Sequence, residues 1–116
     1  MRSLRVSIME VRYMQQTLSK VKKLEKFIQK HGEDTVISQT IVKMLEYKIQ
    51  KFDEQIKKLN KELKKFERIY KKKSEVFSKE FNDGKLGDNI DFIEWSSLFK
   101  MRNRLLVKKS ELESMK

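Results

Sequence analysis

Residues 42–70 read VKMLEYKIQKFDEQIKKLNKELKKFERIY. Apolar side chains recur here at alternating steps of three and four residues, at Val42, Leu45, Ile49, Phe52, Ile56, Leu59, Leu63, Phe66 and Tyr70. We call these nine residues the apolar seam, because such spacing places them on one side of a helix, as in a coiled coil. We predict one helix from about Thr35 to Lys73, roughly 55 to 60 Å long at 1.5 Å per residue. One helix cannot bury its own seam, so a partner helix is required.

The segment before this helix supplies a candidate partner. Apolar residues recur at similar spacing from Val11 to Ile28, which predicts a helix from about residue 6 to Lys30. Gly32 accepts the left-handed conformation that closes a helix, and residues 33–35 (Glu-Asp-Thr) supply acid and hydroxyl groups suited to starting the next one. So short a connection predicts an antiparallel coiled-coil hairpin.

After residue 73 the sequence changes character. Ser74 is typical of a helix start, and Phe77 and Phe81 lie four residues apart on one face of the short helix that follows. Residues 82–88 read NDGKLGD, the only turn-rich stretch of the chain. The spacing of Asp91 and Glu94 is typical of a capping box, so we predict a last helix that starts there and folds back on the hairpin.

The predicted fold is therefore all-α. A long antiparallel coiled-coil hairpin occupies residues 1–73, and one short and one longer helix in residues 74–116 pack against one end of it, within the same domain. The seam is longer than its neighbours can cover jointly, so we also predict a homodimer through the long helix.

The composition argues against an enzyme. A chain of 116 residues without cysteine has no thiolate nucleophile or thiolate metal ligand, and its small core leaves little room for an enclosed active site. The only histidine, His31, lies at a predicted helix end, where a cation merely complements the helix dipole. The acids around Gly84 and Gly87 do not fit the ligand spacing of a calcium loop. We expect no catalytic residue, metal or cofactor.

No apolar run is long enough for a membrane span, and we expect a cytoplasmic protein without membrane contact. The net charge of +11 favours an acidic partner. The surplus is concentrated in residues 36–73, which contain twelve Lys and Arg against five Asp and Glu.

Eight of these cations fall on the helical face opposite the apolar seam. We call them the basic stripe: Lys57, Lys58, Lys61, Lys64, Lys65, Arg68, Lys71 and Lys72. Such a stripe can follow the phosphates of a nucleic acid. It is equally the solvated face that any coiled coil presents. No aromatic residue lies within it, so stacking on unpaired bases has no support.

Acids, aromatic residues and two of the three glycines gather between residues 77 and 95. Aromatic residues are usually core, yet the same composition is typical of an interface. We interpret this segment as a partner-recognition element. Its residues are Phe77, Phe81, Gly84, Gly87, Asp88, Asp91, Phe92, Glu94 and Trp95.

The same segment resembles a known group of proteins. Small helical antitoxin-like proteins of archaeal and bacterial toxin–antitoxin pairs resemble this chain at Ser74-Glu75, Phe77, Phe81, residues 84–88 (GKLGD), Asp91-Phe92 and Glu94-Trp95, preceded by residues 45–49 (LEYKI) and 66–70 (FERIY). The resemblance implies that the protein binds and neutralises a small toxin acting on RNA, and that it binds its own operator. A structural coiled-coil adaptor is a third interpretation.

Overall fold

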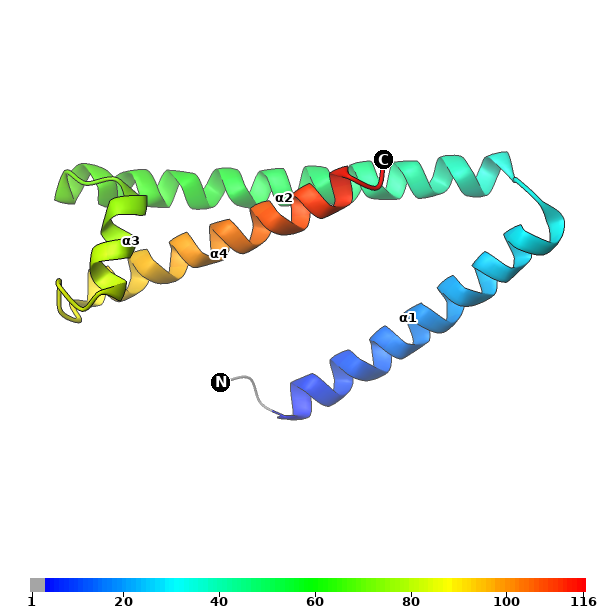
Figure 1. Ribbon diagram of the computed structural model, residues 1–116, viewed down its shortest axis with the longest axis horizontal. Helices are drawn as coiled ribbons and strands as arrows, with labels where there is room; N and C mark the ends of the chain where they lie inside the picture. Colours follow the sequence, from blue (N-terminus) through cyan, green and yellow to red (C-terminus); the bar gives the residue numbers. More distant parts are fainter. Residues whose placement is uncertain (1–3) are drawn as a thin grey trace. The chain divides into compact units, whose positions relative to one another are not determined.

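A computed structural model describes residues 4–116, with side chains from Ser7 onward. Its four helices are α1 (Leu4–His31), α2 (Thr35–Tyr70), α3 (Ser74–Asn82) and α4 (Ile90–Glu113), as Figure 1 shows. No strand occurs in this described part, which confirms the all-α fold. The chain divides into two compact units, residues 1–40 and 41–116. The segment 74–116 therefore shares a unit with most of α2, and the boundary lies inside that helix.

The first unit contains α1 and the first turn of α2. Gly32 has φ +89°, and its N–H donates to the carbonyl of Ile28 at 2.7 Å. This is the expected left-handed helix end. The carboxylate of Asp34 accepts a hydrogen bond from the N–H of Ile37 at 3.0 Å, so Asp34 caps α2. The apolar residues of α1 from Val11 to Leu24 are exposed in this unit. The predicted pairing of α1 with α2 stays a prediction.

The long helix α2 ends three residues earlier than predicted. Lys71 adopts a left-handed backbone, with φ +51°, and the N–H of Lys72 donates to the carbonyl of Glu67 at 3.2 Å. This is the closing bond of a Schellman motif. A left-handed non-glycine residue costs roughly 1 to 2 kcal/mol, so the surrounding structure must hold this turn. The start of α3 at Ser74 agrees with the prediction.

Two glycines shape the connection from α3 to α4. Gly84, with φ +76°, closes α3 with the bonds of a Schellman motif, from Gly84 N–H to Phe81 and from Lys85 N–H to Glu80. Gly87 also has a positive φ, of 74°.

The predicted capping box of α4 is wrong. Asn89 is the N-cap, and its side chain accepts a hydrogen bond from the N–H of Asp91 at 2.8 Å. Asp91 therefore lies inside the first turn, which places its side chain toward α2 instead of at the cap.

In the second unit α4 runs back along α2 in the opposite direction (Figure 1). Four contacts follow each other down the helix pair: Tyr70 with Asp91, Phe66 with Trp95, Asn60 with Arg102, and Asp53 with Lys109. The part of the seam from Ile49 to Leu63 is buried at four positions by this packing. The final helix thus covers much more of α2 than the one end that the sequence predicts. The homodimer through α2 stays a prediction, and a monomeric mass by light scattering would contradict it.

Candidate functional site: the basic stripe of α2

The aromatic residues between 77 and 95 form the core of the second unit. Leu63, Phe77, Trp95 and Phe99 are its buried members, and Phe77 and Trp95 have no exposed surface at all. A partner cannot touch these two side chains while the unit is folded. Both are used to join α3 and α4 to α2, which argues against the predicted contact of Phe77 and Trp95 with a partner.

Trp95 also belongs to a buried chain of hydrogen bonds. Its indole N–H donates to the hydroxyl oxygen of Ser74 at 2.9 Å. The hydroxyl and the backbone N–H of Ser74 both donate to the Oε2 atom of Glu67, at 2.8 and 2.9 Å. Lys73, the N-cap of α3, makes no side-chain cap bond. Glu67 thus caps α3 from the neighbouring helix, a role that the sequence offered no signal for.

Asp91 is half-buried and faces α2. Its Oδ2 atom accepts a hydrogen bond of 2.5 Å from the hydroxyl of Tyr70. This hydrogen bond, with burial and the nearby carboxylate charge, raises the pKa of Tyr70 above the usual 10.0. Asp91 is therefore engaged within the protein.

The other predicted recognition residues divide between core and surface. Phe81 and Phe92 are half-buried and pack against the core. Gly84, Gly87, Asp88 and Glu94 are exposed. The exposed apolar residues beside them are Ile90 and Ile93, which are 79% and 51% accessible. The accessible edge at this end thus includes two carboxylates and two isoleucines, beside the exposed Asp83 and Lys85 of the turn.

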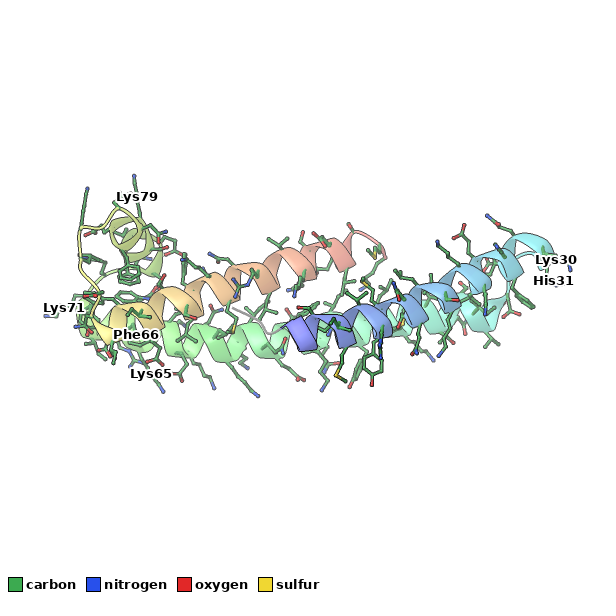
Figure 2. The ribbon with its side chains drawn as sticks, turned by 90° about the horizontal axis from the view of Figure 1, so that it is seen from below. Lys30, His31, Lys65, Phe66, Lys71 and Lys79 are labelled. Atoms are coloured by element: carbon green, nitrogen blue, oxygen red, sulfur yellow. The ribbon has the colours of Figure 1, made fainter. Side chains whose placement is uncertain are left out.

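The basic stripe from Lys57 to Arg68 lies on the surface of α2 as its spacing predicts, whereas Lys71 and Lys72 belong to the turn after the helix. Seven of its eight residues are exposed, and Lys72 is half-buried. Phe66 lies between α2 and α4, whereas the adjacent Lys65 points away from α4 (Figure 2). The packing of α4 against the seam therefore leaves the stripe open.

Few carboxylates neutralise the stripe. Lys65 pairs with Glu62 and Lys72 pairs with Glu80, each at 3.1 Å. Within the described part of the chain no ion pair is made by the other six stripe residues: Lys57, Lys58, Lys61, Lys64, Arg68 and Lys71. Two acids at the edge of the seam are engaged elsewhere, since Asp53 pairs with Lys109 at 2.6 Å and Glu67 caps α3. The positive charge of the stripe is consequently retained.

The stripe ends in an open hollow of about 450 Å³, which we call the terminal hollow. Its lining residues are Lys64, Glu67, Arg68, Lys71, Lys72 and Lys73. Five of the six are cations. Lys73 is the residue that the sequence-based stripe omits, although the run of three lysines at 71–73 pointed to it.

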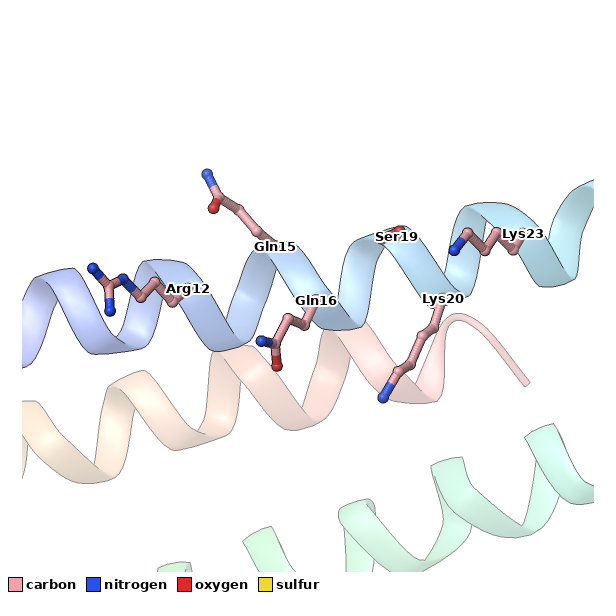
Figure 3. Close-up of a pocket in the computed structure, with 6 residues that line it drawn as sticks. All are labelled: Arg12, Gln15, Gln16, Ser19, Lys20 and Lys23. Atoms are coloured by element: carbon pink, nitrogen blue, oxygen red, sulfur yellow. The ribbon is translucent and has the colours of Figure 1, made fainter.

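A second basic surface lies on α1, in the first unit. Figure 3 shows the polar side chains that line a shallow hollow along this helix: Arg12, Gln15, Gln16, Ser19, Lys20 and Lys23. Residues 12–23 carry four cations and no acid. Residues 57–73 carry nine cations and two glutamates. The larger cluster of cations therefore lies on the carboxyl half of α2 and the turn after it.

The described residues contain no group of three or more His, Asp or Glu side chains placed to hold a metal ion. None of the described helices combines the length and the apolar character needed to cross a membrane. Comparison with protein-family models, curated proteins and solved structures finds no match for the chain.

Proposed function

We propose that the protein is a non-enzymatic binding protein, and that the basic stripe of α2 binds the phosphate backbone of a nucleic acid. The observation that supports this best is the separation of charge on α2. Its cations from Lys57 to Arg68 are exposed, while Asp53 and Glu67 are engaged by α4 and α3. Only Lys65 among these cations has an ion pair within the described part of the chain, with Glu62. The positive charge of this face is therefore only partly offset by the acids of α2.

The dimensions of the stripe suit a backbone. The helix from Lys57 to Arg68 is about 16 Å long at 1.5 Å per residue. One strand of a duplex places a phosphate about every 3.4 Å of axis, so this length matches about five phosphates. The face presents no aromatic side chain between these cations, which favours a duplex over unpaired bases that need a stacking platform.

The test compares two variants that remove the same charge. Lys61→Glu, Lys64→Glu and Arg68→Glu together reverse the centre of the stripe. Lys20→Glu, Lys22→Glu and Lys23→Glu reverse three exposed lysines of α1. We expect the first variant to abolish duplex binding in an electrophoretic or anisotropy assay and the second to retain most of it. Equal loss in both would mean that net charge, and not this face, governs binding.

A second candidate function is the capture of a small protein toxin, acting on RNA, by an antitoxin-like protein. The exposed edge of Asp88, Ile90, Ile93 and Glu94 favours it, since apolar side chains flanked by carboxylates suit a basic protein surface. The test is a pull-down with the product of the neighbouring gene.

Asp88→Ala with Glu94→Ala examines this edge directly. Exposed residues at a helix start usually contribute about 1 kcal/mol or less, so helicity should stay intact while the toxin complex weakens. The stripe variant should leave that complex unchanged. Retention of full affinity by the Asp88/Glu94 variant would place toxin recognition elsewhere. A purely structural coiled-coil adaptor would bind neither a toxin nor a nucleic acid.

A further inference from the structure

We propose that the terminal hollow binds a phosphomonoester, namely the phosphate at the end of a nucleic-acid strand whose backbone lies along the basic stripe. This inference rests on the proposed function, and it assigns one chemical group to one end of that surface. The hollow gathers five cations within about 450 Å³, whereas the rest of the stripe spreads its cations along the helix.

The charge of the hollow suits a dianion better than a diester. A terminal phosphate carries a charge of about −1.5 to −2 at pH 7, compared with −1 for a backbone phosphodiester. Lys64 and Arg68 lie four residues apart on one face of α2, and Lys71 follows in the left-handed turn after the helix end and also lines the hollow. The guanidinium of Arg68 supplies the forked donor geometry that matches phosphate oxygens.

The single acid in the hollow is already satisfied. Oε2 of Glu67 accepts hydrogen bonds from both the N–H and the hydroxyl of Ser74, at the start of α3. These bonds, and the start of the α3 dipole, offset the charge of the carboxylate. Lys72 is the only lining cation in an ion pair within the described part, with Glu80. Four cations therefore remain to meet a ligand.

The backbone around the hollow is fixed by its own bonds. Lys71 is held in the left-handed region by the bond from Lys72 N–H to the Glu67 carbonyl. Lys73 follows in an extended conformation and leads directly into α3. The lysines at 71–73 are thus presented by a defined turn instead of by a fraying helix end, which lowers the entropy cost of binding.

The position of the hollow points to the end of a strand. The stripe runs along α2 toward Arg68, and α2 itself ends at Tyr70. A backbone that follows the stripe reaches the hollow where the helical surface stops. A strand that ends at this point places its terminal phosphate among the lining cations of the hollow.

The experiment uses one short blunt duplex in three forms, with hydroxyl ends, with 5′-phosphates and with 3′-phosphates. Binding to the full chain is measured by anisotropy at constant ionic strength. Since each charge-assisted hydrogen bond is strong, we expect at least one phosphorylated form to bind about threefold to tenfold more tightly. Equal affinity for all three forms would overturn this inference and leave the proposed function standing. Absence of binding by every form would overturn the proposed function itself.

Matched variants locate the effect. Arg68→Gln with Lys71→Asn removes two cations of the hollow, and asparagine tolerates the left-handed backbone at position 71. Lys57→Gln with Lys58→Gln removes two cations at the far end of the stripe. The hollow variant should lose the preference for phosphorylated ends, whereas the control should weaken all forms alike and keep the preference. A preference that survives in the hollow variant contradicts the assignment.

Inorganic phosphate serves as the last probe. Inorganic phosphate should compete only weakly with the phosphorylated duplex end for the terminal hollow, because it lacks the contacts along the stripe. If inorganic phosphate bound as tightly as the phosphorylated duplex, the hollow would be a free-phosphate site and the assignment to a strand end would be overturned.

Discussion

The indole of Trp95 lies flat against the ring of Phe77, with 3.8 Å between their centroids and 4° between their planes. The indole is also stacked with Phe66 and Tyr70 of α2, at centroid distances of 5.7 and 5.8 Å. One side chain of α4 is thus held between α3 and α2. The position of α3 depends on this stack. The turn at residues 71–73, which leads into α3 and lines the terminal hollow, therefore depends on it as well.

Phe77→Ala should therefore destabilise the second unit strongly. Removing a fully buried phenylalanine usually costs about 3 to 5 kcal/mol of unfolding free energy. Urea unfolding followed by the fluorescence of Trp95, the only tryptophan of the chain, measures the loss. Val76→Ala is the control on the same helix, because Val76 is half exposed, and it should change stability by less than about 0.5 kcal/mol. Equal effects of the two variants would contradict the assigned core.

Glu67→Ala should cost more than Glu67→Gln. Alanine leaves the N–H and hydroxyl of the buried Ser74 without an acceptor, and an unsatisfied buried donor costs about 1 to 3 kcal/mol. Glutamine keeps one carbonyl oxygen in nearly the same place. A double-mutant cycle with Ser74→Ala should give a coupling energy between about 0.5 and 3 kcal/mol. Additive effects would mean that Glu67 does not cap α3.

Alkaline pH should weaken the contact between α2 and α4. The pKa of Tyr70 is raised by its hydrogen bond to Asp91, so the protonated hydroxyl contributes stability that is fully present below pH 10.0, the usual value. This contribution is lost as the pH rises through the folded-state pKa of Tyr70. The pKa of Lys109 is also raised, chiefly by its hydrogen bond to Asp53. The stability that this pair contributes is therefore also lost at alkaline pH.

Tyr70→Phe isolates the first of these groups. The difference in unfolding free energy between the parent and this variant should narrow as the pH rises above 10.0, and denaturation at a series of pH values measures it. If this difference stayed constant at pH values well above the pKa of free tyrosine, the Tyr70–Asp91 hydrogen bond would make no pH-dependent contribution to stability.

The sequence predicts the helices better than their packing. Gly32 and Asp34 mark the helix ends between α1 and α2 because each acts locally. The start of α3 at Ser74 is also predicted, although its cap comes from Glu67 of α2. The end of α2 at Tyr70 is missed because Lys71 takes a left-handed backbone, a conformation that glycine normally signals. The antiparallel course of α4 depends on Arg102 with Asn60 and on Lys109 with Asp53. Such polar pairs across 42 or more positions have no sequence pattern.

The two candidate surfaces also differ in how well the sequence predicts them, because one depends on local spacing and the other on packing. The part of the basic stripe from Lys57 to Arg68 follows from helical periodicity alone, so its exposure could be predicted. The composition of residues 77–95 fits a core and an interface equally well, and only burial distinguishes them. Phe77 and Trp95 are core because α3 folds across the end of the α2–α4 pair. No spacing in the sequence encodes that crossing.

The salt dependence of duplex binding tests the central claim most directly. Five phosphate contacts predict that the logarithm of the binding constant falls with the logarithm of salt concentration with a slope of about −4 to −5. Lys61→Ala, Lys64→Ala and Arg68→Ala together should reduce the steepness by about 2 to 3. A parent slope near zero, or a slope that the triple variant leaves unchanged, would contradict binding of a phosphate backbone by the basic stripe.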